Sequence, residues 1–267
     1  MSSAVSARTV STTSLATFVS PAAEIVRCRV HGEAVFFAVT EPRDAIQRHH
    51  LSGTFYETEE LDLIKQYFPI GGRFFDIGAN VGNHSLYVAK FLRARSVVPV
   101  EINPEAFQTL RTNMVLNQVD GVVDDSWLGL GVSSESCDSA TIRFHSRNIG
   151  GGKVALEGGD LQLVTADTIS DGRDFDMIKI DVEGMELKVL AGLFETIERS
   201  RPRIFVEVDN ENADAFFEWV KENGYRVAGQ FRRYRANENF MLVPKRPVVW
   251  SRIRTALKAT QMKEAKQ

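Results

Sequence analysis

The segment FFDIGANVGNHS, at residues 74–85, has glycine and asparagine where a helix should begin. An apolar run leads into Asp76, and Gly78, Asn80 and Gly82 follow before an apolar helical pattern starts. A buried strand that delivers an acid to such a turn forms the usual ligand crevice of an open α/β sheet. Gly78 and Gly82 would let the backbone pass close to a ligand, because glycine has no Cβ. The segment therefore predicts a binding loop.

Strand and helix patterns alternate on both sides of this loop. Strand patterns occur at residues 73–77, 96–101, 175–181 and 203–208, with closing extended segments at 225–231 and 239–244. Helix patterns occur at residues 83–94, 104–117, 184–199 and 212–224. Such alternation predicts a mainly parallel sheet covered by helices on both faces.

Composition divides the chain into four expected parts. Residues 1–22, rich in Ser, Thr and Ala, are expected to be a disordered leader, with a transit peptide as the alternative. Residues 23–52 alternate around His31 and Gly32 as a hairpin would, which predicts an N-terminal β-flap. Residues 53–244 would form the main domain, in which the extended segments 122–132, 140–145 and 161–164 predict an inserted hairpin around the turn-rich 148–153. Residues 245–267 form a basic tail.

Length and charge limit the class of protein. The chain has 267 residues, 43% hydrophobic and 25% charged, which suits one sizeable α/β domain with appendages. A net charge of -3 gives no sign of a nucleic-acid partner. From Lys245 onward seven basic residues stand against Glu264 alone, so the tail carries +6 and the rest -9. The tail could touch an anionic membrane surface or an acidic partner, and a solvated helix is the plainer interpretation.

Cysteine usage and hydropathy bear on location. Cys28 and Cys137 lie far apart and lack the spacing of a metal or redox site, which favours a reducing compartment, the cytoplasm. No apolar run approaches the roughly 20 residues of a membrane span. The oligomeric state is left open.

The side chains of the loop indicate the chemistry of its ligand. Asn80 breaks the GxGxxG order of a dinucleotide site, and Asp76 and Asn80 suit an amino-acid zwitterion better than a phosphate. Glu101 ends the next strand, nineteen residues after Gly82, where an acid can bind both hydroxyls of a ribose. An amino acid beside a nucleoside describes S-adenosylmethionine. The alternatives are an ordinary strand-to-helix turn and, less well supported, a nicotinamide site.

Three stretches together resemble the FkbM-type methyltransferases: FDIGANVGNHSLYVAK, VEINPEAFQTLRTNMVLNQ and DMIKIDVEGMELKVLAGL. The resemblance runs from about Gly53 to Pro244. It implies a Rossmann-like class I methyltransferase fold, with a seven-stranded sheet whose last strand is antiparallel, and methyl transfer from S-adenosylmethionine to a hydroxyl of a saccharide or natural product. The stretch 127–136 departs from the family pattern, which affects the adenine contact. The cofactor-binding candidates are Tyr56, Asp76, Gly78, Asn80, Gly82, Asn83, Glu101, Ile102, Asn103 and Asp181.

Catalysis of methyl transfer requires a group that aligns the acceptor oxygen and takes its proton. Asp181, Glu183 and Glu207 follow neighbouring strands, so they are candidates that would meet at the crevice. Converging acids repel, so one should have a raised pKa or a cation should lie among them. Each also has a structural alternative, such as capping a helix or pairing with an arginine. A divalent metal remains an alternative, although no complete ligand pattern is present.

Histidine would be a more natural base at neutral pH. His145, before the turn at 148–153, is the preferred candidate because that insert could close over the acceptor, whereas His84, His49 and His50 are alternatives. A catalytically silent module with the same fold, serving a larger assembly, is the remaining alternative to an enzyme.

Overall fold

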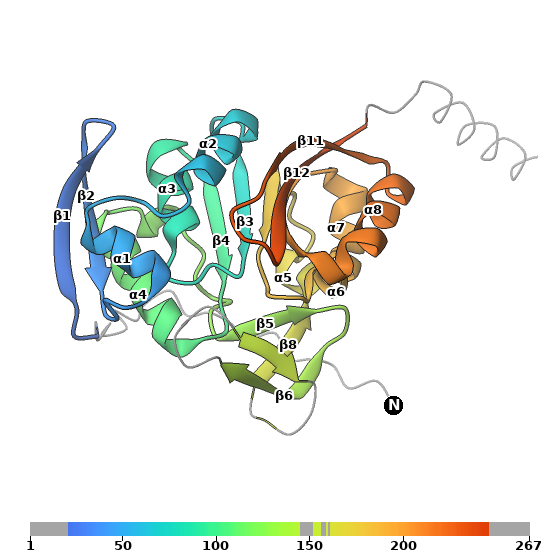
Figure 1. Cartoon of the computed structure of the whole chain (residues 1–267), viewed down its shortest axis with the longest axis horizontal. Helices are drawn as coiled ribbons and strands as arrows, with labels where there is room; N and C mark the ends of the chain where they lie inside the picture. Colours follow the sequence, from blue (N-terminus) through green and yellow to red (C-terminus); the bar gives the residue numbers. More distant parts are fainter. Residues whose placement is uncertain (1–20, 145–151, 156–158, 160, 246–267) are drawn as a thin grey trace, which may run out of the picture.

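The computed structural model describes residues 21–144, 152–155, 159 and 161–245. Its centre is a six-stranded sheet in the order β11-β12-β10-β9-β3-β4 (Figure 1). The strands are β3 (Arg73–Ile77), β4 (Ser96–Val100), β9 (Met177–Ile180), β10 (Arg203–Asp209), β11 (Tyr225–Phe231) and β12 (Asn237–Pro244). The first four run parallel, and β12 is antiparallel to both β10 and β11. The mainly parallel sheet with an antiparallel last strand is confirmed.

The predicted number of strands is corrected from seven to six within the described residues. Where a seventh strand would flank β4, Val123 makes a single parallel bridge to Val97. The chain then turns, and ion pairs of Asp124 with Arg173 and of Asp125 with Arg111 accompany the turn. The expected extended segment 122–132 is therefore wrong over most of its length, since a strand forms only at β5 (Leu130–Ser133).

Two hydrophobic cores lie on the two faces of the sheet. Alternate side chains of β3 divide between them, because Phe74 packs on one side and Phe75 and Ile77 on the other. On the Phe74 side lie α2 (Thr58–Tyr67), α3 (Asn83–Phe91) and α4 (Pro104–Leu116). On the Phe75 side lie α5 (Ala166–Ser170), α6 (Glu186–Ala191), α7 (Phe194–Ser200) and α8 (Ala213–Glu222). The helix expected over 184–199 is two helices, separated at Gly192, a residue with low helix propensity.

The inserted segment forms a separate small sheet, drawn at the bottom of Figure 1. Its strands are β5, β6 (Cys137–Phe144), β7 (Gly152–Ala155) and β8 (Leu161–Thr165), in the order β5-β8-β6-β7. β6 and β7 pair antiparallel, as expected for an inserted hairpin. His145 lies outside the described residues, and so do residues 148–151 of the expected turn. Residues 1–20 of the expected leader and the tail after Lys245 also lie outside them.

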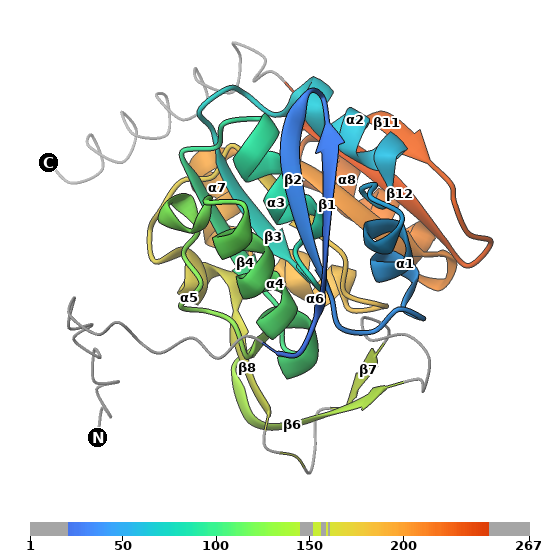
Figure 2. The same ribbon diagram turned by 90° about the vertical axis from the view of Figure 1, so that its left-hand side faces the viewer.

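The N-terminal flap is a hairpin of β1 (Glu24–Val30) and β2 (Glu33–Val39), followed by α1 (Ala45–Leu51) (Figure 2). Its two-residue turn has positive φ at both His31 and Gly32, the geometry that matches the twist of paired strands. The buried side-chain amide of Asn113 on α4 connects the flap to the main domain. Ala38 N, in the flap, donates to Asn113 Oδ1 (2.8 Å), and Asn113 Nδ2 donates to Val81 O in the loop after β3 (2.9 Å). None of the described helices has the length and apolar character needed to cross a bilayer.

Replacing Asn113 by alanine should lower the free energy of unfolding by about 2 kcal/mol, since it leaves a buried N–H and a buried carbonyl without partners. Urea unfolding followed by circular dichroism measures this. The matched control is Gln108→Ala on the same helix, for which we expect a change below about 0.5 kcal/mol. Equal stability of the two variants would show that Asn113 does not hold the flap.

Candidate active site

A pocket of about 370 Å³ opens at the carboxyl ends of the parallel strands. The pocket lies between the neighbouring strands β3 and β9. From β3 the chain continues to β4 on one side, and from β9 it continues to β10 on the other side. Such a switch point is the usual place for a ligand in an open α/β sheet. The pocket is lined by the loops after β3, β4 and β9, by β9 and β10 themselves, by the starts of α1 and α3, by the segment before α2 and by the β11–β12 loop. The lining residues include Tyr56, Glu57, Gly78, Asn80, Asn83, His84, Glu101, Lys179, Asp181, Glu183, Glu207, Tyr234 and Asn237.

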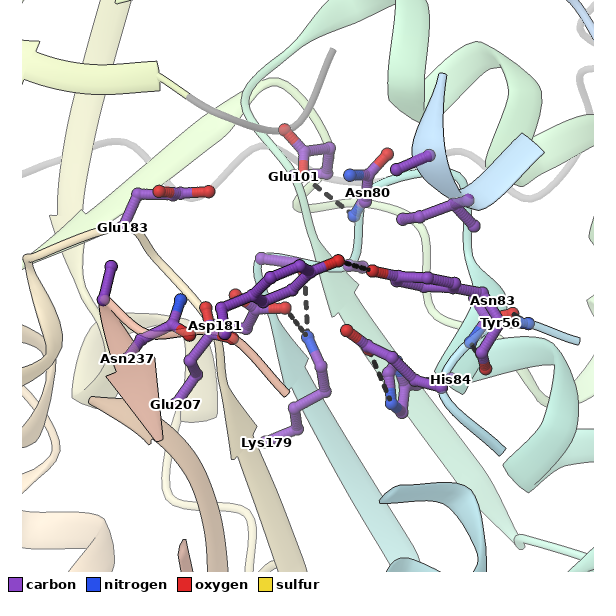
Figure 3. A pocket seen from close by; sticks show the side chains of 17 residues that line it. Tyr56, Asn80, Asn83, His84, Glu101, Lys179, Asp181, Glu183, Glu207 and Asn237 are labelled. Carbon is purple, nitrogen blue, oxygen red and sulfur yellow. Dashed lines mark hydrogen bonds and ion pairs between the residues drawn. The ribbon is translucent and has the colours of Figure 1, made fainter. Parts of the chain in front are cut away.

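A buried lysine lies at the base of this pocket (Figure 3). Strand alternation sends Ile178 and Ile180 into one core and turns Lys179 to the opposite face, in register with Asp76. Lys179 is 2% exposed, and its Nζ lies 3.3 Å from Asp76 Oδ1 and 3.2 Å from Asp181 Oδ2. Burial alone would lower the pKa of Lys179, but the nearby carboxylates outweigh burial and raise it. Lys179 is therefore a fixed positive charge.

Three carboxyl groups meet above this cation. Glu57 comes from the segment before α2, Asp181 follows β9, and Glu207 lies near the end of β10. Burial, followed by the charge of Asp181, raises the pKa of both Glu57 and Glu207. Glu207 also shares a side-chain hydrogen bond with Asp181. Because one cation faces three acids, Glu57 and Glu207 hold their protons to a higher pH than isolated carboxyl groups would.

A neutral histidine borders the same cluster. Burial, followed by the charge of Lys179, lowers the pKa of His84 well below its usual range. Its Nε2 is buried without a hydrogen bond and lies 3.6 Å from Glu57 Oε2. The nearest charged partner of the buried His84 Nε2 is therefore the Glu57 carboxyl group, beyond hydrogen-bond distance.

The loop glycines serve packing as well as access. A Cβ on Gly78 would meet the backbone oxygen of Asp181 at 1.8 Å, so glycine is required where the β3 and β9 loops touch. A Cβ on Gly82 would lie 2.8 Å from Leu110 and Met114 on α4, and its φ is +83°. The missing side chain of Gly82 makes room for α4, so packing also requires glycine here, and a contact of the Gly82 backbone with a ligand stays a prediction.

The place of Asp76 also differs from the expectation. Asp76 is 0% exposed, accepts a hydrogen bond from Ser85 Oγ (2.6 Å) and faces Lys179, and it does not line the pocket. Alternation along β3 turns its side chain into the layer below the pocket floor. The side-chain contacts of Asp76 are therefore with Lys179 and Ser85.

Glu101 faces the pocket in a fixed orientation. Asn80 N donates to Glu101 Oε2 and Asn103 N donates to Glu101 Oε1, both at 2.8 Å. Burial raises the pKa of Glu101 while these backbone amides and Lys179 oppose that rise. Each oxygen keeps a further lone pair for a hydroxyl donor.

Of the remaining cofactor candidates, Tyr56 and Asn83 line the pocket. Asn83 is buried, with Oδ1 accepting from Tyr56 N (3.0 Å) and Nδ2 donating to Tyr56 O (3.0 Å), so it fixes that segment to the start of α3. The Tyr56 hydroxyl bonds that of Tyr234 across the pocket. Asn103 caps α4, and neither it nor Ile102 lines the pocket.

Three residues that line the pocket have strained backbone conformations. Glu57, Asn80 and Glu183 all line the pocket, and all have positive φ, at 55°, 49° and 48°. Asparagine adopts this conformation more easily than glutamate, and Asn80 Oδ1 also accepts from Val81 N (2.8 Å). Strained residues persist where surrounding structure holds them, commonly at functional sites.

Sequence reasoning missed Lys179 and the β11–β12 loop. The signal for Lys179 was a charged residue inside the apolar strand MIKI, directly before Asp181. The loop carries Tyr234 and Asn237 to the pocket and is anchored by Arg233, whose guanidinium bonds the buried Glu60 carboxylate at 2.7 and 3.1 Å. Within the described residues, no three His, Cys, Asp or Glu side chains are arranged to hold a metal ion.

Residues 76–227 match the model of the methyltransferase FkbM domain. The chain is 27% identical over 176 residues to the hexuronic acid methyltransferase AglP of Haloferax volcanii, covering 63% of this chain and 68% of that protein.

A solved methyltransferase structure of low sequence identity shares the fold. The methyltransferase FkbM from Methylobacillus flagellatus superposes with a TM-score of 0.50 at 15% identity, covering 65% of this chain and 44% of that one, so the chain spans less than half of that structure. A precorrin-6y C5,15-methyltransferase from Geobacter metallireducens gives a TM-score of 0.47 at 14% identity, covering 72% of this chain and 89% of that one.

The sheet order and the pocket at its switch point define a Rossmann-like class I methyltransferase fold. The family model matches more than half of the chain, and the chain belongs to the FkbM methyltransferase family.

Proposed function

We propose that this chain is an S-adenosylmethionine-dependent O-methyltransferase that acts on a hydroxyl group of a saccharide or a natural product. The observation that carries the proposal is a pocket lined by carboxyl groups, in which backbone amides hold Glu101 and Lys179 supports Asp181. The relative named a hexuronic acid methyltransferase supports a saccharide acceptor. The proposal places the reaction in the cytoplasm, because Cys28 and Cys137 form no disulfide.

The residues present fit the proposed donor. Glu101 has two fixed oxygens with free lone pairs, which suits the two hydroxyls of a ribose. The acidic lining suits a ligand that carries a positive sulfonium and an ammonium group. When bound, S-adenosylmethionine supplies a methyl group that an acceptor oxygen attacks, while the electrons of the carbon–sulfur bond stay on sulfur.

The proton of the acceptor hydroxyl needs a base, and we assign that role to Asp181. Its side chain is 34% exposed, reaches the pocket, and has the Lys179 ammonium 3.2 Å away to offset its negative charge. Glu207, hydrogen-bonded to Asp181, can share the proton that arrives. Tyr56 and Tyr234 bridge the pocket and help to exclude water. Glu183 lines the rim, and His145, outside the described residues, has no part in this assignment.

Two experiments separate this proposal from its alternatives. Calorimetry should give micromolar binding of S-adenosylhomocysteine and no binding of NAD, which would exclude the nicotinamide alternative. A screen with methyl-labelled S-adenosylmethionine against neutral sugars, glucuronic acid and hydroxylated natural products should then give a labelled product that is stable to base, as an ether is. Cofactor binding without any labelled product would favour the silent module.

Replacing Glu101 by glutamine should weaken binding of S-adenosylhomocysteine about tenfold. The amide cannot accept hydrogen bonds at both positions and loses the charge that strengthens them. Calorimetry measures the dissociation constant, and the matched control is Glu105→Gln, an exposed residue four positions along the chain. Unchanged affinity in the Glu101 variant would place the nucleoside elsewhere.

A further inference from the structure

A second hollow, of about 470 Å³, lies at the opposite edge of the sheet from the active site. Arg203 begins β10, the strand whose far end carries Glu207, and Pro244 ends β12, the strand whose first residue lines the active pocket. The hollow is lined by Tyr67, Arg201, Arg203, Arg226, Val243 and Pro244. It contains three arginines and no acidic side chain.

Arg201 is held firmly in one orientation. Its guanidinium donates to the carbonyl oxygens of Asn223 (2.8 Å) and Gly224 (3.1 Å) and lies 4.6 Å from the centre of the Tyr225 ring. Its ion pair with Glu198 is long, at 3.6 Å, and the Glu198 side chain is 58% exposed, so this pair offsets little of the charge. Arg201 therefore presents a positioned cation at the wall of the hollow.

Arg203 and Arg226 bring further charge without local compensation. In the described part of the chain, neither side chain makes a hydrogen bond or an ion pair. Asp176 is next to Arg203, because the Arg203 backbone N–H donates to the Asp176 carbonyl oxygen (3.0 Å). The Asp176 carboxylate, however, accepts a hydrogen bond from the backbone N–H of Arg73 (2.8 Å) and makes no ion pair with Arg203. Three guanidinium groups around one hollow repel one another, and an anion between them would remove that repulsion.

The geometry of guanidinium groups selects the kind of anion. A guanidinium presents two parallel N–H groups, which match the oxygens of a phosphate group.

We propose that the hollow formed by Arg201, Arg203 and Arg226 binds a phosphate group, supplied either by a free phosphate compound or by the headgroup of an anionic phospholipid. This site is separate from the methyl-transfer pocket and does not depend on the proposed function. It would hold an anionic molecule or surface at the amino ends of the strands while the carboxyl ends remain open to the acceptor.

The full-length protein should be tested with two probes. Calorimetric titration with inorganic phosphate and pyrophosphate measures binding of free phosphate. Co-sedimentation with vesicles of phosphatidylglycerol and phosphatidylcholine, compared with phosphatidylcholine alone, measures binding of the headgroup. The double variant Arg203→Gln with Arg226→Gln should bind about tenfold more weakly to whichever probe the wild type binds, because two charge-assisted contacts are lost. Arg29→Gln, an exposed arginine on the hairpin, is the control and should bind as the wild type does.

Each outcome decides the proposal. Binding of free phosphate that the double variant loses supports a soluble phosphate compound, and binding confined to anionic vesicles that the double variant loses supports a lipid headgroup. Failure of the wild type to bind either probe overturns the site, and so does equal binding by wild type and double variant, which would assign the binding to another surface. If the double variant unfolds on heating earlier than the wild type, Arg226→Gln alone, an exposed side chain on β11, gives the same test.

Discussion

Replacing Lys179 by methionine should reduce methyl-transfer turnover at least a hundredfold and lower the free energy of unfolding by about 3 kcal/mol. Lys179 is the buried cation that faces Asp76 and Asp181 at 3.3 and 3.2 Å. Methionine keeps a similar apolar stem but leaves those carboxylates without a counter-charge in a dry environment. Turnover measured with labelled donor and unfolding in urea test the two effects.

The pH dependence separates loss of charge from general damage. Lys179 lowers the pKa of Glu57 and Glu101, so its removal should raise both pKa values. A carboxyl with a higher pKa keeps its proton to higher pH, and Glu101 must be ionised for both of its oxygens to accept hydrogen bonds from the ribose hydroxyls. The residual activity of the variant should therefore rise at more alkaline pH than the activity of the wild type. Lys188→Met, an exposed lysine on α6, is the control and should change neither quantity. Normal turnover with an unshifted pH profile in the Lys179 variant would contradict its role.

Replacing Asp181 by asparagine should lower kcat about a hundredfold to a thousandfold, the usual contribution of a general base. The amide keeps the size of the side chain but cannot take the proton of the acceptor hydroxyl. Because the change acts on proton transfer, the affinity for S-adenosylhomocysteine should stay within about threefold of the wild type. Steady-state kinetics on an identified acceptor, together with calorimetry, give both values.

Neighbouring acids provide the comparison. Glu183→Gln at the rim and the exposed Asp214→Asn on α8 should each lower kcat less than tenfold. If Glu207→Gln produced the large loss and Asp181→Asn did not, the base would be Glu207, with Asp181 serving only to orient it. A small effect at both positions would mean that the acceptor needs no carboxylate base.

The strand and helix patterns of the sequence were sufficient to predict the central architecture. The strand at 73–77 and the mainly parallel arrangement appear in the structure, because hydrophobic periodicity is a local property. The antiparallel last strand, also present, was implied by the resemblance to the FkbM-type methyltransferases and not by the periodicity. The seventh strand does not extend beyond one bridge to β4, and Asp124 and Asp125, which follow that bridge, pair with Arg173 and Arg111. These arginines come from other parts of the chain, so a local pattern does not encode the pairs.

By itself, the sequence determined that a loop after a buried strand, with Glu101 at the end of the next strand, would face a crevice. Only the tertiary structure decided what surrounds that crevice. The register of β9 against β3 places Lys179 opposite Asp76, and the packing of α2 brings Glu57 within the field of Asp181. Side chains that are distant in sequence acquire their charges and pKa values from burial and from one another, and both arise only when the chain is packed.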